Sequence, residues 1–173
     1  IAGAASWFGD GLIEAMFERP GGFASAAHVA PNGIAERVDG GDRIRGQFQF
    51  GSGSQFAQWF MGAFVLHEGG EPLRTPNGGP QVVIAYAPRE GVFVDTSTWD
   101  VAGMRATGSY DFRFHDQVLP DDYVMVPPGV RRRGGPALDI GVSVGHLSCA
   151  LGIAMRMLDD LFAIARSKQR EGR

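Results

Sequence analysis

The sequence has only one cysteine, Cys149, among its 173 residues. A single cysteine cannot close an internal disulfide or supply a multi-cysteine metal site. Because it lies in a stretch with helical periodicity, we expect its side chain to be a small buried hydrophobe. The four histidines have neither helical metal spacing nor accompanying cysteine or carboxylate ligands, so we expect no metal site.

Long apolar runs and a surplus of positive charge are also missing. No apolar run reaches the roughly 20 residues that a membrane-spanning helix needs, and no charged start precedes an apolar signal segment. The formal net charge is −3, and the only dense basic cluster is the three arginines at 131–133, a pattern typical of a solvated connection. We therefore expect no membrane partner, no nucleic-acid partner and a cytoplasmic location.

The length suits one ordinary domain with a sizeable core, or one domain with pieces of its neighbours. The chain begins with Ile1 rather than methionine and ends soon after a strongly helical segment. We therefore expect it to be part of a longer protein.

Apolar spacing changes twice along the chain. Residues 4–17 repeat apolar side chains every three to five positions, which predicts a short amphipathic helix that ends before the Pro-Gly-Gly at 20–22. Between residues 23 and 126, short strand-like runs alternate with turns rich in glycine and proline. The expected strands cover residues 43–50, 59–66, 81–87 and 110–115, and a hairpin turn is expected at residues 39–42.

The last part of the chain is helical. Apolar residues at spacings of mostly three and four share one face: Leu147, Leu151, Ala154, Leu158, Leu161, Phe162 and Ala165. A one-sided helix of this length needs partner helices, from missing sequence or from another subunit.

These periods together predict an α+β fold. Residues 1–22 would be the end of an N-terminal helical domain, and residues 23–128 a central antiparallel β domain, barrel- or sandwich-like. Residues 129–173 would be a linker and the first long helix of a C-terminal helical bundle, which this chain leaves incomplete.

Three segments carry a family resemblance. They are GGDRIRGQFQFGSGSQFAQWFMGAFV (residues 40–65), WDVAGMRATGSYDFRFHDQVLPDDYV (99–124) and GHLSCALGIAMRMLDDLFAIARSKQR (145–170). Their order resembles that of the acyl-CoA dehydrogenase superfamily, in which a helical domain, a β domain and a helical bundle follow one another. The first segment looks like the family's flavin-contacting hairpin, the second like its later Gly-x-Arg turn and strand, and the third like the first helix of its bundle.

Two short stretches look most like the reduced-flavin monooxygenase branch of that superfamily. They are Phe50-Gly51-Ser52-Gly53 and the sequence TGSYD at residues 107–111. Dehydrogenases of the superfamily usually have Thr-Asn where Ser52-Gly53 stands. They also carry a Glu-Pro-x-x-Gly-Ser-Asp stretch, where this chain has AAHVAPNG at residues 26–33.

The resemblance implies an oxidoreductase that uses reduced flavin, FAD or FMN, and O2 to oxidise a small aromatic or heterocyclic substrate. The sequence shows no nicotinamide-binding motif, so a separate flavin reductase is an expected partner. A homo-oligomer, either a dimer or a tetramer, is also expected. Two alternatives remain: an acyl-CoA dehydrogenase, and a non-catalytic module that binds flavin or forms a subunit interface.

The resemblance places the flavin against the Gly-Ser stretch. Ser52 is expected to form a hydrogen bond near flavin N5 and so to limit the loss of activated oxygen as hydrogen peroxide. Gly51 and Gly53 would let the backbone approach the ring, and Phe50 and Trp59 would wall the cavity. Taken without the family, the stretch is more typical of a bulged strand or a turn than of a cofactor site.

Three further residues are candidates for the same site. Ser25 would give a second hydroxyl to the pyrimidine edge of the flavin, unless it is an ordinary loop serine. His28 and His146 are candidates for a catalytic base, because His28 follows Ser25 and His146 begins the long helix. Both histidines are also consistent with a structural role.

The turn at residues 105–109 supplies a second group of candidates. The resemblance places Arg105, Thr107 and Ser109 beside the ribityl and phosphate part of the cofactor. An arginine with two hydroxyls suits a pyrophosphate. The alternative is that Arg105 closes the fold by pairing with Asp100 or Asp111.

Overall fold

The structure is a computed structural model that describes residues 7–18, 24–127 and 137–171. The chain divides into two units, the first ending at Arg133 and the second beginning at Gly134. The elements are α2 (Asp10–Glu18), β1 (Ser25–Val38), β2 (Gly41–Gly51), β3 (Trp59–Glu68), β4 (Glu71–Pro72), β5 (Val82–Pro88), η1 (Arg89–Gly91), β6 (Val92–Asp95), η2 (Arg105–Thr107), β7 (Tyr110–Leu119), η3 (Asp121–Tyr123), β8 (Val124–Met125) and α3 (Ala137–Glu171).

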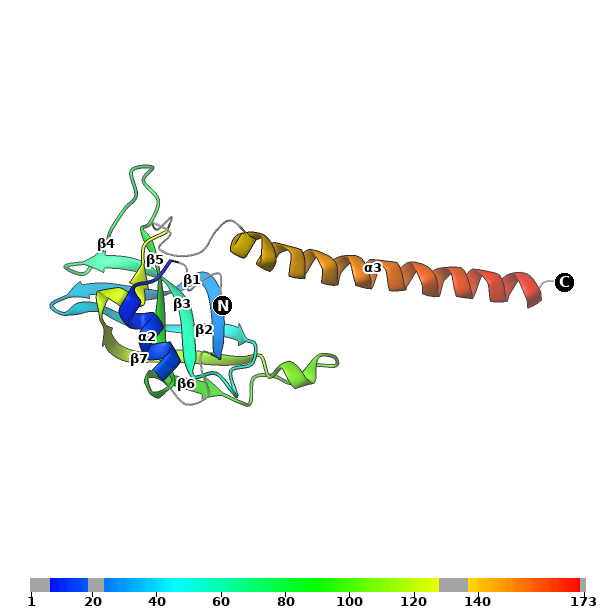
Figure 1. Cartoon of the computed structure of the whole chain (residues 1–173), viewed down its shortest axis with the longest axis horizontal. Helices are drawn as coiled ribbons and strands as arrows, with labels where there is room; N and C mark the ends of the chain where they lie inside the picture. The colour runs from blue at the N-terminus through cyan, green and yellow to red at the C-terminus, as the bar shows by residue number, and fades with distance from the viewer. Residues whose placement is uncertain (1–6, 19–23, 128–136, 172–173) are drawn as a thin grey trace. The chain divides into compact units, whose positions relative to one another are not determined.

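The first unit is built on one eight-stranded sheet with the order β6-β7-β2-β1-β3-β5-β8, and β4 pairs with β3 (Figure 1). Its pairs are antiparallel except β1 with β3, which is parallel. The expected antiparallel domain is therefore wrong for this one pair. The reason is the turn at residues 52–58, which crosses the start of β1: the N–H groups of Gln58 and Trp59 donate to the carbonyl of Ala24 at 2.8 and 3.2 Å.

Four strands and the hairpin turn lie where periodicity predicts them, in β2, β3, β5, β7 and the turn between Val38 and Gly41. Strand β1 is different, because Pro31-Asn32-Gly33 has the composition of a turn. In the structure it lies inside the strand, and the pairing of β1 with β3 shifts register on both sides of Pro31. The proline and glycine therefore mark bulges within a strand rather than its end.

An aromatic cluster forms the main core on one face of the sheet. Its largest members are Phe48, Phe60, Phe64, Phe112 and Phe114, each at most 2% exposed. Ring centroids of Phe60 and Phe112 lie 5.2 Å apart, although β3 and β7 are separated in the sheet by β1 and β2. The sheet therefore curves around this cluster.

Helix α2 covers a second, smaller core. Leu12 and Met16 pack with Trp59, Met61 and Tyr86. Residues 7–9 are not helical, so the expected helix starts later than predicted, at Asp10. The carboxylate of Asp122 in η3 accepts a hydrogen bond from the Gly11 N–H at 3.0 Å, which fixes the first turn of the helix to the sheet.

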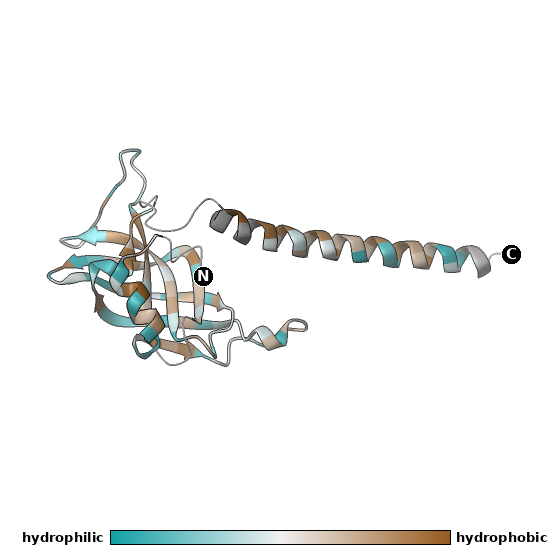
Figure 2. Ribbon diagram, viewed as in Figure 1, coloured by the Kyte–Doolittle hydropathy of each residue, from teal (hydrophilic) through white to brown (hydrophobic). Residues whose placement is uncertain are grey.

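The second unit is the single helix α3, 35 residues long. The predicted apolar stripe is helical and exposed, and apolar residues outside it, such as Ile153, Met157 and Ile164, are exposed as well (Figure 2). The apolar surface of α3 is therefore wider than the single stripe that was predicted. Cys149 is exposed and not buried as predicted, because the second unit is a single helix and supplies no second element to pack on it.

Several sequence features lie outside the described residues: the Pro-Gly-Gly stop at 20–22, the arginines at 131–133 and the side chain of His146. Among the helices that are described, none combines the length and apolar character needed to cross a membrane.

The Asp122 cap leads to a first prediction. Asp122→Ala should lower the free energy of unfolding, measured by urea denaturation, by about 1 kcal/mol, because the Gly11 N–H loses its acceptor. Asp122→Asn keeps an acceptor oxygen and should lose less. Asp121→Ala is the matched control, and an equal loss in both alanine variants would contradict the capping role.

Candidate functional site

Three hydroxyl groups meet where β2 and β7 leave the sheet. Gly51 pairs with Tyr110, so the residue that follows β2, Ser52, and the residue that precedes β7, Ser109, come to lie side by side. Their Oγ atoms are 2.8 Å apart. Thr107 Oγ1 lies 2.9 Å from Ser109 Oγ and 2.8 Å from the carbonyl oxygen of Met104, to which it donates. We call Ser52, Thr107 and Ser109 the hydroxyl cluster.

Other hydrogen bonds hold the two turns of the site together. The Gly53 N–H donates to the Thr107 carbonyl at 2.8 Å, and Ser54 Oγ donates to the Gly108 carbonyl at 3.1 Å. Ser54 is fully buried, and its own carbonyl accepts a bond of 2.8 Å from Arg89 Nη1. Sequence reasoning missed this role of Ser54, although the repeated Gly-Ser pair was a usable signal.

The glycines of the stretch have different reasons to be there. A Cβ on Gly51 would lie 2.7 Å from Cδ1 of Phe112, so the aromatic core requires glycine at this position. Gly53 has a φ of +76°, and a Cβ there would meet no atom within 4 Å. It is needed for its left-handed conformation. The backbone of the Gly-Ser stretch is thus a bulge followed by a turn, as expected if the family resemblance is left aside. The approach of this backbone to a flavin stays a prediction.

Phe50 is a bulky residue in a glycine-like conformation. Its φ is +58°, its side chain is 61% exposed, and its ring stands edge-on to Trp99 at 6.3 Å. Phe56, in the same turn region, is 71% exposed. A left-handed aromatic residue is rare and often marks a functional site. The hydroxyl cluster thus lies beside exposed aromatic surface, to which Phe56 and Trp99 contribute without having been foreseen.

Trp59 and Ser25 face the core under α2. Trp59 is fully buried, and its ring stands 5.7 Å from that of Tyr123. It packs in the small core in this structure, and its role as a wall of the flavin cavity stays a prediction. Burial raises the pKa of Tyr86, an effect that the neighbouring Ser25 hydroxyl partly offsets. The Ser25 side chain is thus beside Tyr86, and the structure does not bring it into the hydroxyl cluster.

His28 is fastened to β2. Its Nδ1 lies 2.8 Å from the Gln49 carbonyl, and because a carbonyl only accepts, Nδ1 carries the proton. Nε2 faces the amide nitrogen of Asn32 at 3.4 Å. A base function of His28 would therefore use Nε2. The backbone of His146 lies in α3, in the other unit.

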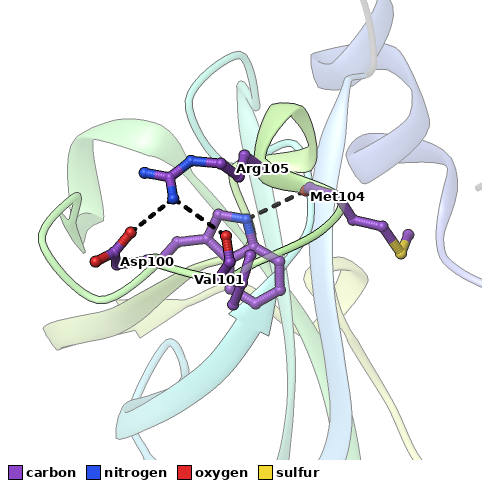
Figure 3. Close-up of polar contacts among 5 residues, drawn as sticks. Asp100, Val101, Met104 and Arg105 are labelled. Atoms are coloured by element: carbon purple, nitrogen blue, oxygen red, sulfur yellow. Dashed lines mark hydrogen bonds and ion pairs between the residues drawn. The ribbon is translucent and has the colours of Figure 1, made fainter.

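Arg105 forms an ion pair. Its Nη1 lies 2.9 Å from Asp100 Oδ1 and donates to the Val101 carbonyl at 3.2 Å, as Figure 3 shows. Of the two carboxylates predicted as partners of Arg105, Asp100 forms the ion pair and Asp111 does not. The Trp99 indole N–H donates to the Met104 carbonyl at 3.4 Å, so this loop also supports the acceptor of the hydroxyl cluster.

Two hollows of the described surface are lined by no residue of the hydroxyl cluster. The larger, about 600 Å³, is at the opposite end of β2, where Arg37, Asp42 and Asp121 line it. The smaller, about 150 Å³, is lined by Gln47, Phe93 and Arg113 among others. Within the described residues, no group of three histidine, cysteine or carboxylate side chains is placed to hold a metal ion.

Comparison with known proteins gives relatives of one kind. The chain is 40% identical over 97 residues to a pigment production hydroxylase of Rhodococcus sp., covering 56% of this chain and 23% of the relative. It is 30% identical over 152 residues to an indole-3-acetate monooxygenase of Pseudomonas putida, covering 83% and 36%. An FADH2-dependent resorcinol hydroxylase, oxygenase component, of Rhizobium sp. is 31% identical over 57% of this chain and 22% of its own. No family model matches the chain.

Solved structures agree with these relatives. The 3-HSA hydroxylase of Rhodococcus sp. RHA1 superposes with a TM-score of 0.63 at 25% identity, over 72% of this chain and 31% of that one. XiaF of Streptomyces sp., solved with FADH2 and glycerol, gives a TM-score of 0.61 at 26% identity, over 73% and 31%. The chain thus spans between about a quarter and a third of the length of the proteins it matches.

The strained Phe50 leads to a second prediction. Inside an ordinary strand, glycine in place of alanine lowers the free energy of unfolding by about 0.5–1 kcal/mol. At a φ of +58° the order should reverse, so that Phe50→Gly has a free energy of unfolding about 1 kcal/mol above that of Phe50→Ala. Both variants lose the contact with Trp99, so their difference in urea denaturation isolates the backbone. Alanine more stable than glycine would refute the strain.

The buried Asp42 leads to a prediction on pH. Burial raises the pKa of this carboxyl, and Asp121 adds to the rise, while Arg37, whose Nε lies 3.7 Å from Oδ1, lowers it. A pKa raised by folding contributes stability that is complete below the unfolded pKa and is lost as the pH rises through the folded pKa.

Asp42→Asn removes this titration. The free energy of unfolding of the variant should therefore rise relative to that of the unsubstituted protein as the pH is raised from about 3 to about 7, the range in which aspartate titrates. Denaturation at a series of pH values measures it. Asp116→Asn, an exposed carboxylate on β7, is the control, and a difference that does not depend on pH would contradict the prediction.

Proposed function

We propose that this chain is the flavin-contacting part of a monooxygenase, starting from its relationship, over part of its length, to the reduced-flavin-dependent monooxygenases of the acyl-CoA dehydrogenase-like fold. The enzyme would use reduced FAD or FMN and O2 on a small aromatic or heterocyclic substrate. The observation that carries the proposal is the hydroxyl cluster, which ends in the exposed Ser52 beside the exposed Phe50 and Phe56.

The residues of the site fit a flavin ring. The ring has flat apolar faces and a polar edge, and it needs aromatic cover together with small hydrogen-bonding groups. Exposed aromatic side chains and an exposed hydroxyl lie within a few residues of one another in the turn after β2. When bound, the reduced flavin supplies two electrons, so that one atom of O2 enters the substrate and the other leaves as water.

The side chains of this chain would position and protect that chemistry. Phe50 and Phe56 would cover the ring and keep water away from it. Ser52 would form one hydrogen bond with N5, at the polar edge of the flavin. Support for a separate reductase comes from the sequence, which has no nicotinamide-binding motif, and from the oxygenase component among the relatives.

The other candidate residues remain part of the proposal, four of them with a role that differs from the predicted one. Arg105 would have to exchange Asp100 for a phosphate group, which its exposure permits. Gly51, Gly53, Trp59 and Ser25 would act by shaping the backbone and core behind the site. His28 and His146 stay candidates for the base that takes a proton from the substrate.

We extend the proposal to the whole protein. Residues 1–22 would end an N-terminal helical domain, residues 23–128 would form a barrel- or sandwich-like domain, and α3 would be the first helix of a C-terminal bundle. The broad apolar side that α3 exposes along its length supports the bundle, since such a helix is stable when that side is buried against others. Assembly as a homo-oligomer and a cytoplasmic location stay predictions.

An experiment on oxygen use tests the function. The longest natural form of the protein is titrated with reduced FMN and FAD without oxygen, then mixed with O2, and hydrogen peroxide release is recorded. Ser52→Ala should release hydrogen peroxide about tenfold faster, the factor expected for one lost hydrogen bond. Incorporation of isotopically labelled O2 into a panel of phenols and heterocycles tests the oxygen transfer itself.

Thr75→Ala is the control, because this half-buried hydroxyl donates to Gly79 within its own loop, beyond the far end of β3. It should behave as the unsubstituted protein does. Flavin binding with oxidation of an acyl thioester and no labelled product would favour an acyl-CoA dehydrogenase. Failure to bind either flavin would leave the non-catalytic interface module.

A further inference from the structure

The hydroxyl cluster has only one arrangement of protons in which all its contacts are hydrogen bonds. The Met104 carbonyl oxygen can only accept, so Thr107 must donate its single proton to it across 2.8 Å. Thr107 Oγ1 can then only accept, and the proton in its 2.9 Å contact comes from Ser109. Ser109 Oγ in turn accepts from Ser52 across 2.8 Å.

This order leaves Ser52 with lone pairs but no free proton. Ser109 is buried at 5% exposure, whereas Ser52, at the end of the series, is exposed. Whatever meets Ser52 from outside therefore meets a hydrogen-bond acceptor. A hydroxyl normally offers both a donor and an acceptor, so the restriction is imposed by Thr107 and Ser109.

The backbone around Ser52 does not compensate with donors. The Ser52 N–H donates to the Phe50 carbonyl at 2.8 Å, the Gly53 N–H to Thr107 at 2.8 Å and the Ser54 N–H to Gly51 at 3.0 Å. These three successive N–H groups are all used inside the protein. The turn therefore offers a ligand the Ser52 hydroxyl as a hydrogen-bond acceptor. None of these three N–H groups is free to donate to the ligand.

We propose that Thr107 and Ser109 are positioning residues that make Ser52 a selective acceptor for a ligand N–H, and that the protein thereby prefers reduced to oxidised flavin. The inference rests on the proposed function, in which Ser52 meets flavin N5. Reduced flavin carries a hydrogen on N5 and donates there, whereas oxidised flavin has only a lone pair at N5. An acceptor facing the lone pair forms no hydrogen bond, so only the reduced form gains this bond and it binds more tightly.

The two turns are also tied together by hydrogen bonds that do not involve the Thr107 side chain. A positioning role of this side chain can therefore be told apart from a purely structural one. The bonds from Gly53 to Thr107 and from Ser54 to Gly108 involve the backbone carbonyls of residues 107 and 108. Replacing the Thr107 side chain leaves both bonds in place. Thr107→Val, which has the same shape but no hydroxyl, therefore removes the proton acceptor of Ser109 while the turn stays tied.

The test is the ratio of the dissociation constants for oxidised and reduced flavin. It is measured with FMN or FAD, whichever the longest natural form of the protein binds. In Thr107→Val the Ser109 proton turns to Ser52, whose own proton then faces the ligand. The preference for reduced flavin should fall about tenfold, equivalent to a drop of about 30 mV in the midpoint potential of the bound two-electron couple.

Two further variants complete the test. Thr107→Ser keeps the hydroxyl and should keep the original ratio. Ser109→Ala removes the acceptor of Ser52 directly, so its ratio should fall as in Thr107→Val, and it serves where the valine variant does not fold.

The outcomes separate the two proposals. A merely structural role would weaken both flavin forms by the same factor, so an unchanged ratio in Thr107→Val or in Ser109→Ala overturns the selective acceptor while flavin binding stands. A fall of the ratio in Thr107→Ser as large as in Thr107→Val would also overturn it. If the unsubstituted protein binds neither flavin form, the proposed function itself fails, and this inference fails with it.

Discussion

The pairing of Gly51 with Tyr110 decides where the groups of the site lie. It is the outermost pair of β2 and β7, so both segments leave the sheet at the same edge, and the residue that follows one strand meets the residue that precedes the other. Ser52 and Ser109 are therefore held together although 57 positions separate them in the sequence. The pair exists only because position 51 has no side chain, since the Phe112 ring occupies the space of a Cβ. Aromatic core and polar site are thus coupled through one glycine.

The order of the chain in the sheet follows from the same turn. After Gly51 the chain crosses the start of β1 and continues as β3 on its other side, which produces the parallel pair. Phe60 and Phe64 of β3 then reach Phe112 and Phe114 of β7 across the curved sheet. A densely packed aromatic core behind the turn gives its hydroxyls fixed positions, which directional hydrogen bonding requires.

Much of the fold, but less of the site, could be predicted from the sequence. Alternating or continuous apolar runs indicated β2, β3, β5 and β7, whereas β1 was missed because a proline and a glycine within a strand resemble a turn. The motifs named Ser52, Thr107 and Ser109 separately, but their contact depends on a long-range strand pairing that periodicity does not encode. The burial of Trp59 was equally inaccessible, because a strand covered on both faces gives no alternation that would show which side meets α2.

The separation of Ser52 from Ser109 by 57 positions in the sequence has a consequence for how the protein is made. The first half of the site leaves the ribosome with β2, and the second half follows only after β3, β5 and β6 have been synthesised. Closing so large a loop is slow compared with forming the β1–β2 hairpin. The nascent protein therefore passes through a stage with a formed hairpin and no site, and the hydroxyl cluster forms only once β7 has been added.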